Sequence, residues 1–202
     1  MIEANIEISK DDIREIKQRL GQFKDKTPNV LSRAINRTVA SIKTEIKRDA
    51  AKQYSITQRD VNATLIDRRA TSKELYGYVK STGAVIPLSK FRISPQRTVM
   101  YDDNGKPNPS HYSAAVFKGH GLKALDRNPK AFAAIMPNHH GGMYERTGEK
   151  GRNGKEIIEQ RFGPSVPHMI KNKTVISDIT SKAESTLHKR IDAEINYILS
   201  RG

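Results

Sequence analysis

The strongest constraint on the fold is the stretch from Pro28 to Tyr54, PNVLSRAINRTVASIKTEIKRDAAKQY. Its apolar residues recur at spacings of three and four, which is typical of one helical face. At about 100° per residue they fall within a sector of roughly 100°. The members of this stripe are Leu31, Ile35, Thr38, Val39, Ile42 and Ile46. A helix of this length is a rod of about 39 Å whose apolar side another part of the chain must cover. The anchors that we expect in the core are Leu31, Ile35, Ile42 and Ile46.

Basic residues project from the opposite side of the same helix. Thr27 is a candidate N-cap, and Pro28 suits the first helical position, where no N–H group is required. The cations of this side are Arg33, Arg37, Lys43, Lys47 and Arg48. Our candidates among them for contact with DNA or with a neighbouring subunit are Arg33, Arg37, Lys47 and Arg48.

The segments at the two ends of the sequence are also periodic. Alternation of isoleucine and alanine with polar residues from Ile2 to Ile8 predicts a half-buried strand. Ser9 then opens a helix, with Asp12 as its capping partner. From about Thr174 the apolar spacing is again three or four, as far as Ile198. We therefore predict a strand and a helix within residues 1–27, the long helix over 28–54 and a C-terminal helix over 174–202.

The middle of the chain, residues 55–170, has short β-like runs separated by glycine and proline. Its least regular part, residues 94–130, is predicted to be a projecting loop or an extended hairpin. The fold class that satisfies all of these patterns is α+β, with residues 1–202 as one domain. In this arrangement an antiparallel sheet from the middle of the chain is covered by the long helix and the C-terminal helix.

The charge of the chain is strongly basic, with 36 basic and 22 acidic residues and a net charge of +14. Residues 28–54 contribute +4 and residues 55–177 contribute +10, whereas the two ends are neutral. This concentration favours a polyanion or an acidic protein as partner. The alternative is a solvated basic surface without a dedicated ligand.

A glycine-rich turn near the end of the β-rich region concentrates three of these cations. Gly142–Thr147 and Lys155–Phe162 flank the sequence GEKGRNG, which predicts a hairpin. Its tip supplies further candidates for contact with a subunit or DNA, namely Lys150, Arg152 and Lys155. The exit from the sheet, Phe162-Gly163-Pro164-Ser165-Val166-Pro167, is expected to fix how the last helix leaves it. Its structural residues are Phe162, Gly163, Pro164 and Pro167.

Catalytic and metal-binding patterns are weak. The chain has no cysteine, and His139-His140 lacks the i, i+4 spacing of a helical zinc site. The glycine-rich tip does not have the spacing of a phosphate-binding loop. We therefore expect no cofactor, no metal and no catalysis. The competing hypothesis is an enzyme, such as a nuclease, with a site made of His139, His140 and Glu145. The sequence shows neither a signal peptide nor a membrane span, so we expect a soluble protein made in a cytoplasm, without a membrane partner.

Several motifs occur in an order that resembles the family of phage and prophage minor tail protein Z. The first are Ala34-Ile35-Asn36-Arg37-Thr38 in the long helix and Tyr54-Ser-Ile followed by a turn and Val61. Next comes Ile86-Pro87-Leu88-Ser89-Lys90-Phe91. The last is Tyr144-Glu145-Arg146-Thr147-Gly148, which leads through the basic tip to Phe162–Pro167. Together they span about residues 30–170.

The resemblance implies a structural virion protein that completes a long non-contractile tail at its head-proximal end and prepares it to join the head. It implies a homo-oligomeric ring, with a hexamer as one option, and partners among other tail and neck proteins, such as a tail terminator and a head connector. It places the protein in the virion, and in the host cytoplasm during assembly. The basic surface also allows nonspecific contact with phage DNA. The alternative function is that of a basic protein that binds DNA without sequence preference.

Overall fold

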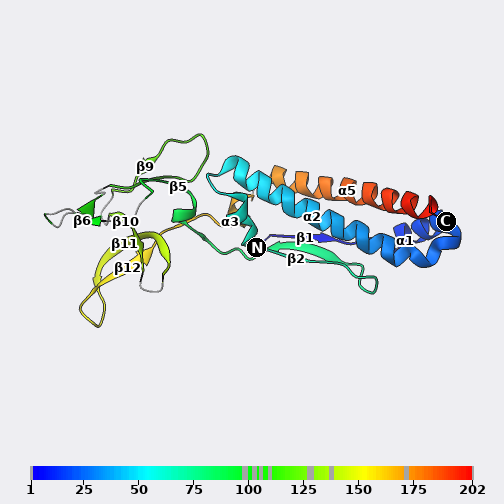
Figure 1. Cartoon of the computed structure of the whole chain (residues 1–202), viewed down its shortest axis with the longest axis horizontal. Helices are drawn as coiled ribbons and strands as arrows, with labels where there is room; N and C mark the ends of the chain where they lie inside the picture. The colour runs from blue at the N-terminus through cyan, green and yellow to red at the C-terminus, as the bar shows by residue number, and fades with distance from the viewer. Residues whose placement is uncertain are drawn as a thin grey trace. The chain divides into compact units, whose positions relative to one another are not determined.

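The computed structural model describes residues 2–96, 100–101, 104, 107–108, 111–126, 130–136, 139–170 and 173–201 (Figure 1). The chain forms two compact units. We call the first the helical unit; it consists of Met1–Asp49, Asn62–Gly83 and Ile170–Gly202. The second, the β-rich unit, consists of Ala50–Val61 and Ala84–Met169. The fold class is α+β, as the sequence predicts.

The helical unit contains the long helices of the chain and one antiparallel sheet. Its helices are α1 (Lys10–Leu20), the 3-10 turn η1 (Gly21–Lys26), α2 (Thr27–Gln53) and α5 (Lys173–Leu199). Its sheet has the strand order β1-β3-β2, formed by Ile2–Ile6, Gly77–Ser81 and Leu65–Arg68 respectively. In the register, Ile6 lies opposite Gly77, and Leu65 lies opposite Ser81. The two long helices agree with the predicted ranges 28–54 and 174–202 to within a few residues.

The start of α1 follows the predicted capping pattern. The Ser9 side chain accepts a hydrogen bond from the Asp12 backbone N–H at 3.1 Å, and its hydroxyl donates to the Asp12 carboxylate at 2.6 Å. The start of α2 is different, and the prediction of Thr27 as an N-cap is wrong. Thr27 has helical backbone angles, φ −48° and ψ −49°, and its hydroxyl donates to the Lys24 carbonyl. Because η1 runs directly into α2, preceding carbonyls take the place of a cap.

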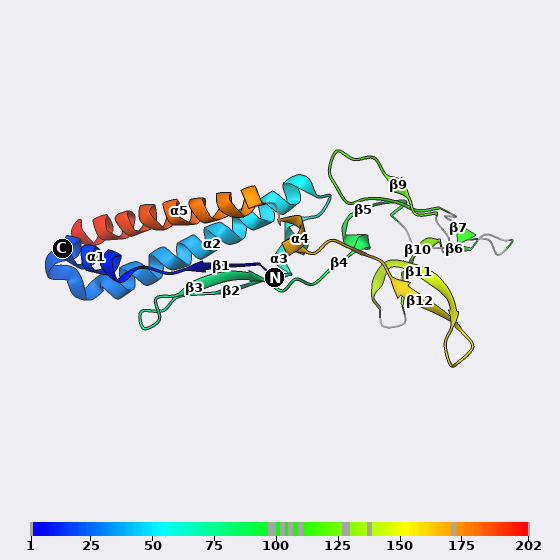
Figure 2. The ribbon, with the colours of Figure 1, turned by 180° about the vertical axis from the view of Figure 1, so that it is seen from behind.

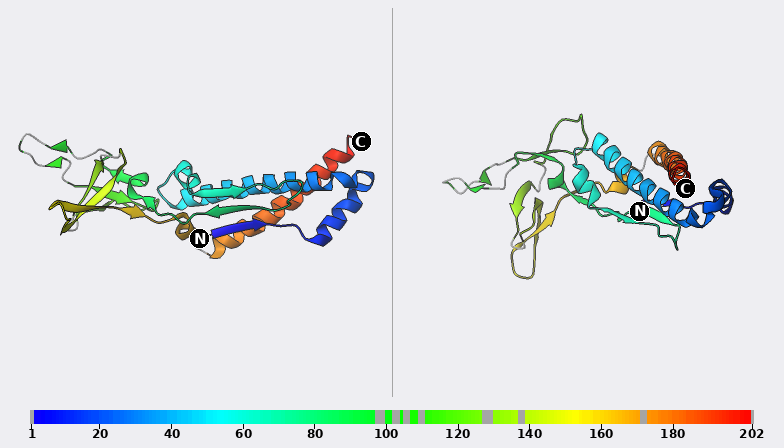
Figure 3. Two further views of the ribbon diagram at one scale, coloured as in Figure 1. Left: turned by 90° about the horizontal axis from the view of Figure 1, so that it is seen from below. Right: turned by 45° about the vertical axis from the view of Figure 1, so that its right-hand side comes forward.

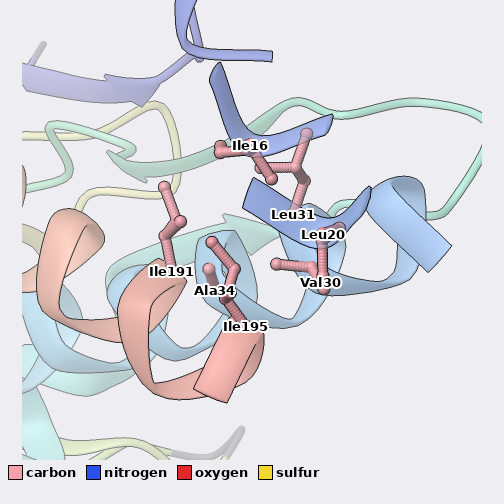
Figure 4. Close-up of a cluster of buried hydrophobic side chains, with 7 residues drawn as sticks. All are labelled: Ile16, Leu20, Val30, Leu31, Ala34, Ile191 and Ile195. Atoms are coloured by element: carbon pink, nitrogen blue, oxygen red, sulfur yellow. The ribbon is translucent and has the colours of Figure 1, made fainter. Parts of the chain in front are cut away.

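The apolar stripe of α2 is buried along its length. The four predicted anchors, Leu31, Ile35, Ile42 and Ile46, are all at most 3% exposed. One side of the stripe lies against β3, since a Cβ atom built on Gly77 would be 2.8 Å from the Ile35 side chain. Figure 4 shows a second contact, in which side chains of α1, α2 and α5 meet. That cluster contains Ile16, Leu20, Val30, Leu31, Ala34, Ile191 and Ile195.

The layers of the helical unit differ from the predicted arrangement. The sheet that contacts α2 combines the N-terminal strand β1 with β2 and β3 from the first part of the middle region. The C-terminal helix α5 packs on α1 and α2 through Ile191 and Ile195. In Figures 1 and 3, α2 lies between the sheet and α5. One helix therefore covers the sheet and the other covers that helix, whereas the sequence suggested two helices on one sheet.

The β-rich unit is built from small antiparallel sheets, which Figure 2 shows from behind. Strands β10 (Ala131–Ile135), β11 (Gly141–Lys150) and β12 (Glu156–Gln160) form one sheet in that order. A second has the order β5-β8-β9, formed by Arg92–Ser94, Ser113–Ala115 and Lys123–Ala124. Two-stranded pairs join β4 (Ile86–Pro87) to β13 (Phe162–Gly163), and β6 (Met100–Tyr101) to β7 (Pro107–Asn108). The helical pieces are α3 (Gln58–Asn62), η2 (Leu88–Lys90) and α4 (Val166–Met169).

The region 94–130, predicted as a projecting loop or an extended hairpin, contains paired antiparallel strands in its described parts. Strand β8 pairs with β5 on one side and with β9 on the other. Residues 97–99, 102–103, 105–106, 109–110 and 127–129 of this region lie outside the described residues. The segment after β8 is attached to the end of α2: the Lys118 N–H donates to the Gln53 carbonyl, and the Ser55 N–H donates to the Val116 carbonyl.

Candidate functional site

The predicted basic hairpin is present as the turn between β11 and β12. Its tip is closed by two backbone hydrogen bonds, from the Gly151 N–H to the Lys155 carbonyl at 2.8 Å and from the Gly154 N–H to the Gly151 carbonyl at 3.0 Å. Gly154 has φ +72°, a conformation that glycine adopts without steric cost. The hairpin therefore presents Lys150, Arg152 and Lys155 together, and all three are exposed.

The base and the tip of this hairpin differ in how their charges are paired. At the base, Arg146 pairs with Glu156 at 2.9 Å, and Arg161 pairs with Glu145 at 2.8 Å. Over the described part of the chain, no ion pair involves the three tip cations. Glu145 and Glu156 are thus paired with arginines, whereas Glu149 and Glu159 of the same strands have no ion pair with a described residue. The tip keeps its own positive charge for a ligand or a neighbour.

Two of the candidate cations of α2 share one partner inside the protein. Arg33 lies 3.5 Å from Glu194 of α5, and Arg37 lies 3.1 Å from the same carboxylate. The Glu194 side chain is 5% exposed, whereas both arginine side chains are more than half exposed. A carboxylate held out of water requires such compensation. The structure thus gives Arg33 and Arg37 an internal role in joining α2 to α5.

The other two predicted cations of α2 differ from each other. Arg48 forms an exposed ion pair with Glu45 at 3.3 Å. Glu45 also accepts a hydrogen bond from Lys182 of α5 at 3.2 Å, and this bond, with the nearby carboxylates, raises the pKa of Lys182. Lys47 is half-buried and has no ion pair with a described residue. None of the four candidate cations of α2 is therefore both exposed and without an ion pair to a described residue, as the three cations of the hairpin tip are.

The segment Phe162–Pro167, predicted to lead the chain out of the sheet, belongs to the β-rich unit. Phe162 and Gly163 form β13, which pairs with β4, and α4 begins at Val166, two residues after Pro164. A Cβ atom built on Gly163 would be 2.4 Å from the Phe91 ring, so a larger residue does not fit there. Phe162 is 47% exposed, and Pro164 and Pro167 are half-buried. The chain thus turns from a strand into α4 before α5 begins.

The histidine pair proposed for an enzyme lies at a turn. His139 has φ +62°, and its N–H donates to the Met136 carbonyl between β10 and β11. Glu145 faces Arg161 in an ion pair. Among the described residues, no group of three histidine, aspartate or glutamate side chains is arranged to hold a metal ion. An open pocket of about 250 Å³ lies beside β10 and β11, and its lining residues are Ser89, Ile93, Gln96, Ala133, Ala134, Gly141 and Gly142.

Sequence reasoning missed two features of the β-rich unit. One is a chain of rings, in which Tyr54, Phe117 and His120 lie at centroid distances of 4.7 and 5.4 Å. Burial raises the pKa of the Tyr54 hydroxyl. The other is the presence of exposed sheet edges at β9 and β12. Strand β9 has only two residues, so its sequence shows no alternation of apolar and polar residues that could predict a strand. In β12, the adjacent apolar residues Ile157 and Ile158, both exposed, are a sequence signal for an uncovered strand.

None of the described helices has an apolar stretch of the length needed to cross a lipid bilayer. In comparisons with known proteins, no family model matches the chain, and no curated protein or solved structure is significantly similar to it.

Proposed function

We propose that this protein is a structural subunit of a phage tail, which acts as a ring at the head-proximal end of the tail and prepares it to join the head. The proposal rests on the ordered motifs between residues 30 and 170, which resemble the minor tail protein Z family. It assigns the protein a non-catalytic role. Its partners are further copies of itself and neighbouring tail or neck proteins, such as a tail terminator and a head connector. It acts in the host cytoplasm during assembly and in the virion afterwards.

The structural observation that supports this role best is the distribution of exposed apolar side chains. Seven of the ten large ones among the described residues belong to the β-rich unit. Ile135 is 64% exposed and Val85 is 55% exposed. A concentration of apolar side chains that the chain does not cover itself favours contacts with other proteins. A subunit of an assembly would bury them against its neighbours.

Deletion of the gene from a phage or prophage that encodes this protein tests the proposal. We expect normal heads to accumulate beside tails that do not join them, and supplied protein to restore joined particles. The measurement is a count of joined and free particles by negative-stain electron microscopy, together with mass spectrometry of purified virions. Normal particle yield without the gene, or virions that lack the protein, would contradict the proposal.

A second candidate function is DNA binding without sequence preference, and the hairpin tip is the observation that favours it. Three exposed cations at one turn suit contact with phosphates. Fluorescence anisotropy of a labelled duplex, measured over a series of salt concentrations, tests this function. Binding by contact with phosphates weakens steeply with salt, and an affinity that does not change with salt argues against it.

A further inference from the structure

Among the described strands of the β-rich unit, β9 and β12 are two of those that lie at the edge of a sheet. Strand β12 is last in the order β10-β11-β12, and β9 is last in the order β5-β8-β9. Lys123 and Ala124 of β9 are exposed, as are the first four residues of β12. Figures 1 and 2 show β9 and β12 at opposite borders of this unit. An open edge can add a strand from another chain, because its N–H and C=O groups have no partner.

The hydrogen bonds identify which backbone groups of β12 point outward. The Arg161 N–H donates to the Met143 carbonyl at 2.7 Å, so this pair is hydrogen-bonded across β11 and β12. Bonded and non-bonded pairs alternate along an antiparallel ladder. Tyr144 opposite Gln160 is therefore a non-bonded pair, and so is Arg146 opposite Ile158. The N–H and C=O groups of Ile158 and Gln160 thus face the open edge.

The same argument applies to β9. The Leu125 N–H donates to the Tyr112 carbonyl at 2.7 Å, so these two residues form a hydrogen-bonded pair. The next pair, Ser113 with Ala124, is non-bonded, and the alternation continues to Leu122. The backbone groups of Leu122 and Ala124 therefore face outward. Each edge offers two outward residues with one residue between them.

We propose that copies of this protein assemble head to tail, with β9 of one copy paired antiparallel to β12 of the next. The outward residues then bond as Ala124 with Ile158 and Leu122 with Gln160. This register sets Lys123 directly opposite Glu159, which is a favourable cross-strand pair. The exposed Leu122 and Ile158, at 38% and 39%, become covered in the same contact. The inference rests on the proposed function, because it supplies the contact through which a ring closes.

Charge explains why the occupant of each edge is the other edge of a second copy. If two β12 edges paired with each other, their outward residues would set Glu159 opposite Glu159. If two β9 edges paired, Lys123 would lie opposite Lys123. Like charges directly opposite each other are destabilising, so both symmetric pairings are disfavoured. The pairing of unlike edges is heterologous, and it generates rings or filaments according to the rotation between copies.

Charge exchange in the full chain tests this contact, with sedimentation velocity and native mass spectrometry as measurements. The unmodified protein is expected to form oligomers that grow with concentration. We expect Glu159→Lys alone, or Lys123→Glu alone, to weaken association about tenfold, because each sets like charges opposite each other. The chain with both exchanges restores opposite charges and should assemble again, as should an equimolar mixture of the two single variants.

A matched control is Glu149→Lys, which changes the net charge equally at an exposed residue of the same hairpin and should leave association unchanged. Ile158→Pro is a second variant. It removes an N–H group that faces the open edge, retains the bonds to β11 and should abolish assembly. Circular dichroism verifies that each variant is folded; if the double exchange does not fold, the mixture of single variants decides.

Three results would overturn the inference: a monomeric unmodified protein at every concentration, single variants that associate normally, or folded exchanged chains whose association is not restored. These results are distinct from failure of the proposed function. A protein that forms rings through another surface, with both edge variants assembling normally, removes the β9–β12 contact and leaves the tail role standing. Normal particle yield without the gene removes the tail role, whatever the oligomer experiment shows.

Discussion

Ile35 is fully buried between α2 and the sheet, and its side chain limits residue 77 to glycine. We expect Ile35→Ala to lower the free energy of unfolding by about 2–5 kcal/mol, because it removes buried methyl groups and leaves a cavity. The matched control is Ile66→Ala in β2, where the side chain is 50% exposed and the cost should be below about 1 kcal/mol. Chemical denaturation followed by circular dichroism measures both. Equal costs at the two positions would show that the α2 stripe is not the core.

Glu194 is the buried charge on which the contact between α2 and α5 depends. Replacing both Arg33 and Arg37 with alanine leaves this carboxylate without its compensating charges. We expect the free energy of unfolding to fall by about 1–3 kcal/mol. This is less than the loss of a fully buried ion pair would cost, because both arginine side chains are more than half exposed to solvent. Thermal unfolding measures the loss.

Two further variants define the cause of that effect. Arg48→Ala removes the exposed ion pair between Arg48 and Glu45. It should lower the free energy of unfolding by less than about 1 kcal/mol. Glu194→Gln in the chain without both arginines should recover part of the lost stability, since no unpaired charge remains buried. If that third change brings no recovery, the carboxylate is not the source of the loss.

The tip of the β11–β12 hairpin carries three exposed cations without an ion pair to any described residue. We expect replacement of Lys150, Arg152 and Lys155 with alanine to leave folding unchanged, because all three side chains are exposed. If the tip contacts phosphates, the slope of log K against log salt should fall by about 2.7, which is 0.9 for each of three contacts. Anisotropy titrations with a DNA duplex measure the slope.

A control for the hairpin prediction removes the same charge elsewhere. Lys10, Lys17 and Lys24 are exposed residues of α1 and η1, and their replacement with alanine also lowers the net charge by three. An equal effect of the two triple variants would mean that only the overall charge matters. An unfolded hairpin variant would show that the tip has a structural role.

The whole molecule is expected to unfold in two steps, because each compact unit has its own buried residues. Leu31 and Ile191 belong to the helical unit, whereas Tyr112 and Met143 belong to the β-rich unit. Units with separate cores depart from a single cooperative transition. Ile35→Ala should therefore lower the midpoint of only one step in a thermal scan. One transition that moves as a whole would show that the two units unfold together.

Local patterns predicted the elements well, and the contacts between distant parts of the chain poorly. The Ser9 cap and the α2 stripe depend on residues within a few positions of each other, so the sequence displays them directly. The ion pairs of Glu194 join residues about 160 positions apart. No local pattern around Arg33 or Arg37 could therefore predict Glu194 as their partner. Likewise, the pairing of β1 with β3 is nonlocal, which is why the prediction placed strands of the middle region on α2 but did not include β1 in that sheet.

The order of segments in the helical unit has a consequence during synthesis. The unit takes its residues from three stretches of chain, and the whole of Ala84–Met169 lies before the last of them. A ribosome therefore synthesises the β-rich residues before Ile191 and Ile195, the two residues that α5 contributes to the buried cluster around Leu31. At about 5–20 residues per second, these two residues are missing from the cluster for several seconds. During this interval α2 exposes part of its stripe, and a nascent chain would need a chaperone most at that stage.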